Sequence, residues 1–224
     1  GAVGGNLSIT ATTGDITQGL ALAVTGTSSF TTSNNGVITL NNTSNAFASA
    51  VTLSTTGAAA HAIIDNGTTT LDIAASTVGG DLTLTSGATA GITDSGNVTV
   101  TGNLVATTDA NSGLINMGTL RVDGTIALTT DGTGNATIVN DDDINFAVST
   151  VRGALSATAT SNSITDTGIL TISGTSTFTT SQSGASITLD LVNVLTGAVA
   201  LNTSGSDGDA LVDNGTTTLD IAAS

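Results

Sequence analysis

The sequence lacks several residue types, and each absence narrows what the chain can do. None of its 224 residues is cysteine, which excludes disulfides, thiolate metal sites and cysteine nucleophiles. Proline is also missing, so no residue removes a backbone donor from a ladder of strands. There is no tryptophan or tyrosine and there are only four phenylalanines. That is little aromatic volume for tandem Ig-like sandwiches, which usually have an aromatic core.

Positive charge is almost missing, since Arg121 and Arg152 are the only arginines and there is no lysine. All 17 acidic residues are aspartate, and the formal net charge is −15. We therefore expect no nucleic acid partner, because phosphate binding needs clustered lysine and arginine. Attraction to anionic lipid surfaces is not expected either. No apolar run is long enough to span a bilayer, so we expect no direct membrane insertion.

Small polar and β-branched residues fill most of the chain and form short alternating segments. Apolar residues occupy every second position in 7–10, 82–85, 98–100 and 187–189. This period of two is typical of strands that bury one face. Clusters of Gly, Asn, Asp and Ser separate the segments and favour tight turns. Helix is disfavoured, because aspartate prefers turns and caps, and glutamate and lysine are absent.

An internal repeat is the strongest pattern in the sequence. Residues 65–76 return unchanged at 213–224, an offset of 148 residues (213 − 65), and a weaker copy lies at 140–149. The segments that begin at Val3, Val78 and Val151 also match one another. We divide the chain into three blocks, 1–75, 76–148 and 149–224, and interpret them as one continuous solenoid from a longer chain.

Short strands at this spacing fit an antiparallel sandwich or a parallel solenoid, and the repeat length favours the solenoid. The block openings are 75 and 73 residues apart (78 − 3 and 151 − 78), shorter than the roughly 100 residues of an Ig-like module. We predict an all-β, right-handed parallel β-helix with coils of roughly 18–25 residues and about nine to twelve coils. At about 4.8 Å per coil, the rod would be about 45–60 Å long.

The repeats resemble those of filamentous-haemagglutinin-like exoproteins over the whole chain. Residues 5–11, 14–17 and 22–26 follow the repeat grammar of that family, and residues 45–53 are similar to another of its recurring phrases. These are large bacterial surface or secreted proteins, often exported by two-partner secretion, with β-helical shafts. The resemblance implies an extracellular or cell-surface adhesin shaft that acts as a rigid spacer. Its partners would be further repeats or fibre neighbours stacked end to end, and a receptor bound by a tip outside this chain.

No residue pattern predicts a catalytic, cofactor-binding or metal site. Asp141–Asp143 is the one run of charge, but it lacks the spacing of an EF-hand or a calcium-binding β-roll, and we interpret it as a solvated turn. His61 has no recognisable acid and nucleophile near it in the sequence. Polysaccharide-cleaving enzymes also use β-helices and often need a carboxylate pair. Because such a site needs a singular patch and this chain repeats its patterns, we predict that it is not an enzyme.

A ligand-binding solenoid is the alternative to a shaft, with ice or carbohydrate as the ligand. Flat threonine ladders on β-solenoids can bind ice, but an ice-binding face needs the same dipeptide at one position in every coil, and the threonine positions here differ between blocks. Few aromatic side chains are available to stack on sugars. Asn-x-Ser/Thr sequons, which could accept glycan in an exported protein, occur at Asn6, Asn41, Asn42, Asn66, Asn97, Asn135, Asn202 and Asn214.

The shaft hypothesis makes the three blocks mechanical equivalents. Ser76 and Ser149 begin blocks 2 and 3 at matching positions, and each is followed by Thr and Val. Deleting residues 76–148 should therefore join the end of block 1 to an equivalent block start and leave a shorter, folded rod. A deletion out of phase should be tolerated less, because a slipped register turns core residues outward.

Overall fold

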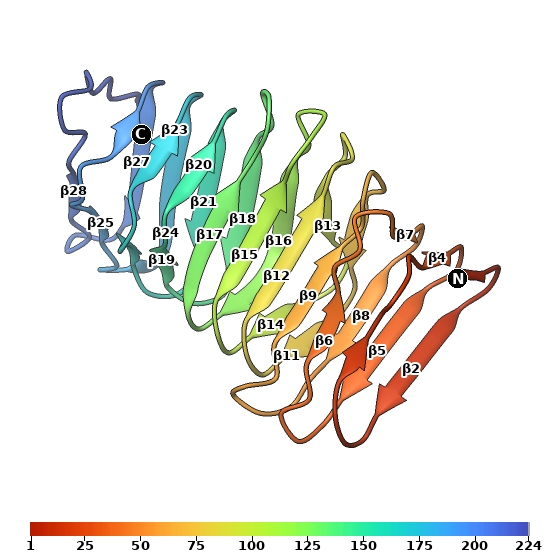
Figure 1. Cartoon of the computed structure of the whole chain (residues 1–224). Helices are drawn as coiled ribbons and strands as arrows, with labels where there is room; N and C mark the ends of the chain where they lie inside the picture. Colours follow the sequence, from red (N-terminus) through yellow and green to blue (C-terminus); the bar gives the residue numbers. More distant parts are fainter. Residues whose placement is uncertain (224) are drawn as a thin grey trace.

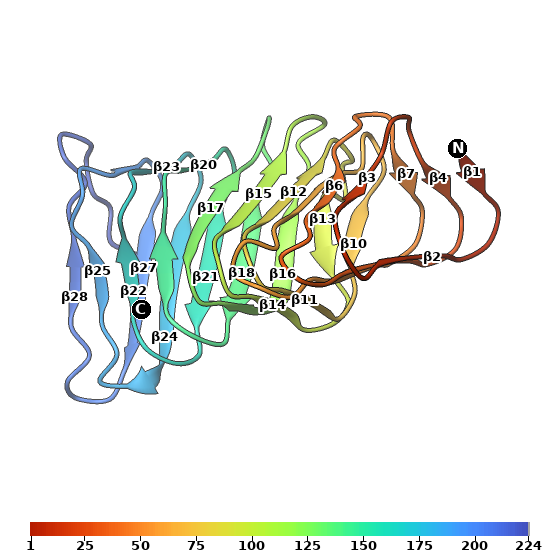
Figure 2. The same ribbon diagram turned by 60° about the horizontal axis from the view of Figure 1, so that its bottom comes forward.

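The chain folds as one continuous parallel β-solenoid, as predicted. The computed structural model describes residues 1–223, so Ser224, the last residue of block 3, lies outside the described residues. About ten coils stack along one axis (Figure 1, Figure 2). The described residues form strands and turns without an α-helix. None of them builds a helix with the length and hydropathy needed to cross a membrane.

Two long sheets and one short sheet form the walls. Sheet 1 contains β2 (Leu7–Ala11), β5 (Ser28–Thr32), β8 (Val51–Ser54), β10 (Leu71–Ile73), β11 (Ser76–Val78), β13 (Ile92–Asp94), β14 (Val98–Val100), β16 (Ile115–Val122), β18 (Ala136–Asn140), β21 (Leu155–Ala159), β24 (Ser176–Ser183) and β27 (Val199–Ser204). Sheet 2 contains β3 (Ile16–Thr17), β6 (Ile38–Leu40), β9 (Ala62–Asp65), β12 (Leu82–Ser86), β15 (Leu104–Thr108), β17 (Thr125–Thr129), β19 (Ile144–Phe146), β20 (Ser149–Val151), β22 (Ile164–Asp166), β23 (Leu170–Ile172), β25 (Ile187–Leu189), β26 (Val194–Leu195) and β28 (Ala210–Val212). Sheet 3 contains β1 (Ala2–Val3), β4 (Ala23–Val24) and β7 (Ala46–Phe47).

Each coil places its strands in parallel register on the coil before it. The step between paired residues varies along the rod: it is short between Ala136 and Leu155 and longer between Ile38 and Ala62. Both steps lie within the predicted coil length of roughly 18–25 residues. With about ten coils at roughly 4.8 Å each, the stack is about 48 Å long.

The core is a narrow apolar column that runs along the whole rod. Inward positions of most strands are fully buried and the intervening positions face outward, as in Leu82–Ser86. All four phenylalanines are fully buried and form two edge-to-face pairs, with ring centroids 5.8 Å apart for Phe30 and Phe47 and 6.2 Å apart for Phe146 and Phe178. The small aromatic content therefore suffices for this core.

Buried polar side chains hold the turns. Asn66 is fully buried, where its side-chain oxygen accepts from the Phe47 amide at 2.7 Å and its nitrogen donates to the carbonyls of Phe47 and Thr70 at 3.1 and 2.8 Å. A second hydrogen bond recurs at the ends of strands. In each case a threonine hydroxyl donates to the backbone carbonyl four or five residues later. It is found at Thr32, Thr55, Thr108, Thr130, Thr180 and Thr203.

Successive blocks are offset by half a coil. The matching residues Leu7, Leu82 and Leu155 lie in sheet 1, sheet 2 and sheet 1. From β2 to β21 the chain of paired strands advances by seven coils, so two blocks span seven coils and one block spans three and a half. A wall bends where one strand is followed by two shorter strands in the next coil. In sheet 1, β8 pairs with both β10 and β11, and later, in sheet 2, β17 pairs with both β19 and β20.

Candidate functional site

Threonines line up in one outward-facing column of sheet 2. The parallel register runs through Thr85, Thr107, Thr129, Thr150 and Thr171. Asp65 and Val194 occupy the same position in the coils on either side of this column. The threonines therefore keep one position over five successive coils but not in every coil, and the comparison between blocks did not show this alignment. The alignment runs between successive coils of unequal length, so it cannot be seen by comparing blocks. Threonine pairs on neighbouring strands also stabilise a sheet, so the column contributes to the stack itself.

A surface hollow of about 270 Å³ lies at β16, the long strand of sheet 1 that pairs with both β13 and β14. Between Met117 and Leu120, β16 has two residues opposite one residue of β18, which is a β-bulge. The Asp94 carboxylate holds this bulge from the coil below. One of its oxygens accepts from the Gly118 amide at 2.9 Å, and the other accepts from the amide and hydroxyl of Thr119 at 2.8 and 2.9 Å.

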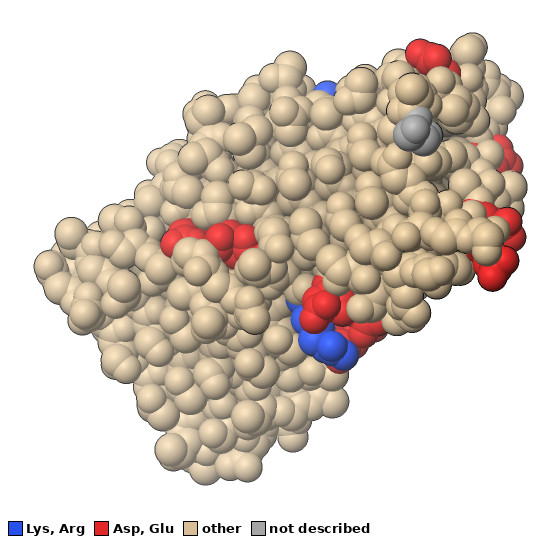
Figure 3. All heavy atoms as spheres, turned by 180° about the vertical axis from the view of Figure 1, so that it is seen from behind, with Lys and Arg blue, Asp and Glu red and all other residues tan. Residues whose placement is uncertain are grey.

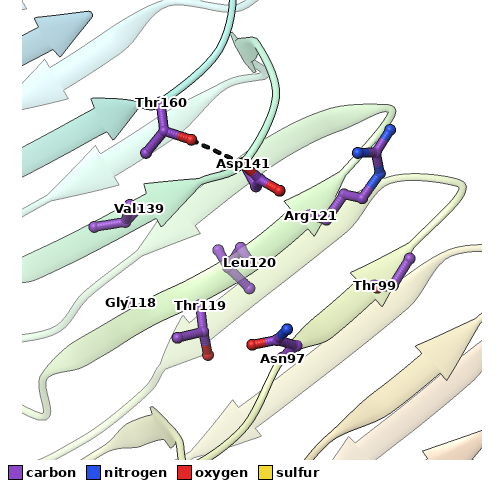
Figure 4. Close-up of a pocket in the computed structure, with 9 residues that line it drawn as sticks. All are labelled: Asn97, Thr99, Gly118, Thr119, Leu120, Arg121, Val139, Asp141 and Thr160. Carbon is purple, nitrogen blue, oxygen red and sulfur yellow. Dashed lines mark hydrogen bonds between the residues drawn. The ribbon is translucent and has the colours of Figure 1, made fainter. Parts of the chain in front are cut away.

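Residues from four successive coils surround this hollow (Figure 4). Leu120 lies between Asn97 and Thr99 on one side and Asp141 on the other. Asp141 accepts a hydrogen bond from the Thr160 hydroxyl at 3.0 Å.

Arg121 also lines the hollow, and its positive charge is paired with two aspartates. Its Nη2 lies 3.3 Å from Asp142 Oδ2 and its Nε lies 3.5 Å from Asp123 Oδ1. Charged atoms are sparse on the face seen in Figure 3, where one patch sets basic atoms against acidic ones. Among the described residues there is no group of three or more His, Cys, Asp or Glu that could hold a metal ion.

The aspartate run occupies the turn between β18 and β19. Burial is the main cause that raises the pKa of the Asp143 carboxyl, and repulsion from Asp142 and Asp123 raises it further, against a backbone hydrogen bond that lowers it. Burial also raises the pKa of Asp65, with a smaller contribution from Asp109, while its hydrogen bond from the Gly67 amide lowers it. Both carboxylates therefore disfavour the folded state when they are ionised.

Residues that occur once or twice in the chain converge on this hollow. The single methionine, Met117, is buried beneath the bulge, and one of the two arginines and the only aspartate run flank it. The hollow is therefore a local departure from the repeated pattern of the chain. Their rarity was visible in the sequence, but the register that joins 97–99, 118–121 and 139–141 was not.

His61 lies beside Asp81 rather than in a catalytic triad. Its Nδ1 accepts a hydrogen bond from the Asp81 amide at 2.8 Å and lies 3.3 Å from Asp81 Oδ2. A neutral ring that accepts at Nδ1 carries its proton on Nε2. A triad histidine needs the opposite tautomer, with Nδ1–H directed at the acid. His61 therefore holds the turn before β12, beside a hollow of about 230 Å³ that includes Val37 and Ile63.

The remaining sequence candidates lie apart. Arg152 is exposed at the edge of a hollow of about 330 Å³ that includes Thr129 and Asp131, separate from the Arg121 hollow. Two sequon asparagines, Asn66 and Asn214, are buried and hydrogen-bonded, so the folded chain does not present them to a glycosylating enzyme. Four sequon asparagines are exposed: Asn6, Asn41, Asn97 and Asn135.

Comparison with known proteins identifies a repeat family. A family model described as "Repeats of unknown function (DUF5649)" matches residues 1–54, 58–117 and 133–202, which together are more than half of the chain. The model thus finds three repeats, with bounds that differ from those of the blocks. A search of curated proteins and a search of solved structures found no match.

Proposed function

The chain belongs to the DUF5649 family of repeats, and we propose that it forms part of the shaft of a bacterial surface fibre or adhesin. The shaft acts outside the cell as a rigid spacer. Its partners are further repeats or fibre neighbours stacked end to end, and a receptor is bound by a tip elsewhere. This proposal assigns no catalytic role and no cofactor to the chain.

One observation carries the proposal: the same coil sequence recurs at matching places in an uninterrupted stack. Asn66 and Asn214 make equivalent bonds, with oxygens that accept from the amides of Phe47 and Leu195 at 2.7 Å in both cases. Asn140, midway between them, accepts from the Val122 amide at 2.8 Å. Stacked repeats gain stability from each nearest neighbour, so such a stack extends without a new fold. The resemblance to filamentous-haemagglutinin-like proteins supports the extracellular location.

Labelling of intact cells tests this proposal. Antibodies raised against the 224-residue chain should bind the surface of intact cells of the source organism, and electron micrographs should show the label along thin fibres. Cells lacking the gene are the control. Label that appears only after lysis would overturn the extracellular role, and label on globular particles would overturn the fibre.

The threonine column supports ice binding as a second candidate function. Five hydroxyls in register repeat at the strand spacing of roughly 4.8 Å, and the column beside it contains the uncharged Val105 and Ala127. In this case the chain inhibits ice recrystallisation and Thr129→Lys removes that inhibition. Thr10→Lys, at an exposed position on sheet 1, is the matched control and retains it. Absence of inhibition by the unaltered chain would exclude this function.

A further inference from the structure

We propose that the hollow at the β16 bulge binds a neutral saccharide, so that the solenoid itself carries a ligand site. The site consists of Asn97, Thr99, Arg121 and Asp141 around the half-buried side chain of Val139, and the backbone of Leu120 lies beneath them. This proposal does not rest on the extracellular spacer role.

The hydrogen-bonding groups of this hollow suit hydroxyl groups that both donate and accept. Arg121 has five N–H donors, and its two ion pairs use Nε and Nη2, which leaves other donors for a ligand. Asp141 uses Oδ1 for the Thr160 hydroxyl, which leaves Oδ2 as an acceptor. Within the described part of the chain, the side chains of Asn97 and Thr99 make no hydrogen bond, so donors and acceptors of both kinds remain.

The surrounding charge selects against ionic ligands. Arg121 is already paired with Asp123 and Asp142, and Asp141 adds a further negative charge, so carboxylated, sulfated or phosphorylated ligands meet net repulsion. An organic cation would need aromatic faces for strong binding, but all four phenylalanines are in the core. A neutral polyhydroxylated ligand satisfies the polar groups without either conflict.

Size and shape limit the ligand to about one sugar ring. The volume of about 270 Å³ is just below the range of roughly 300–1,000 Å³ that is usual for small-molecule sites. The half-buried side chain of Val139 can contact the C–H face of a ring. Without an aromatic platform, we expect weak binding, with a Kd of about 1–10 mM.

Titration of the whole 224-residue chain by amide NMR tests the site. The probes are the methyl glycosides of glucose, galactose, mannose and N-acetylglucosamine, each added to about 50 mM, well above the expected Kd. We expect at least one to shift the amide signals of Gly118–Arg121 and Asp141 in a saturable way. Glucuronate, which has a carboxylate on a similar ring, should bind more weakly.

Variants connect the binding to the named groups. Asp141→Ala and Arg121→Met should each weaken binding about tenfold or more, the effect of losing a hydrogen bond to a charged group. Arg152→Met removes the other arginine and should leave binding unchanged. If either variant at the hollow fails to fold, Thr99→Val, which keeps the strand and its shape, should still weaken binding measurably.

Three results would overturn the saccharide site: no saturable shifts with any of the four glycosides, binding that is unchanged by folded variants at the hollow, or glucuronate bound as tightly as glucoside. None of them bears on the cell-surface labelling that tests the shaft. The two proposals can therefore fail separately.

Discussion

At the scale of single residues, the buried asparagines connect one coil to the next. Asn66 bonds both the amide and the carbonyl of Phe47 in the coil below and closes its own turn through Thr70. Replacing it with alanine leaves these buried backbone amide and carbonyl groups without a hydrogen-bond partner. We therefore expect Asn66→Ala to lower the free energy of unfolding by about 2–3 kcal/mol. Asn41→Ala, at an exposed position, should change it by less than about 0.5 kcal/mol. Thermal and urea unfolding of both variants measure the difference, and equal stabilities would contradict this role.

A second residue-scale prediction concerns the raised pKa of Asp143. A carboxyl whose pKa is higher in the folded state than in the unfolded state destabilises the fold when ionised, and this effect disappears as the pH falls through the folded pKa. Asp143→Asn should therefore stabilise the chain at pH 7, by less than about 1 kcal/mol because the group is partly solvated. The gain should vanish near pH 3, where the unfolded-state carboxyl is also largely protonated. Melting temperatures at both pH values test this, and a gain that grows on acidification would contradict it.

At the scale of elements, the strands were predictable but their alignment was not. The alternation in Leu82–Thr85 and Ile187–Leu189 indicates strands directly, and both segments are strands in the structure. The column through Thr129 and the hollow at Arg121 depend on which residues meet between coils. Since the step from one coil to the next changes along the rod, no fixed period in the sequence gives that pairing. The bulge at Gly118 adds a local shift that a pattern of alternation does not indicate.

At the scale of the whole molecule, the coil is the unit that can be removed. Leu82 pairs with Leu104, so deleting residues 82–103 joins Asp81 to a residue that already occupies the matching inward position. We expect this chain to fold, with one strand layer fewer and a rod shorter by about 4.8 Å. Deleting 82–104 instead puts the outward-facing Val105 in the core position, and the side chains that follow it in the strand exchange their inward and outward positions.

Circular dichroism and thermal melting separate the two deletions. The whole-coil deletion should retain the β-sheet spectrum and a cooperative melt. The deletion that is one residue longer should melt at a much lower temperature or not fold. Similar melting of both would show that register does not determine the stability of the stack.

The half-coil offset also decides which way each block points. Leu82 faces inward from the wall opposite Leu7, and Leu155 returns to the first wall. A feature carried once per block therefore alternates between the two sides of the rod, and only every second copy shares a side. Deleting residues 76–148 would not just shorten the rod. It would also turn everything beyond the junction by half a revolution around the axis, so an even or odd number of blocks would set the direction in which a distal binding surface is displayed.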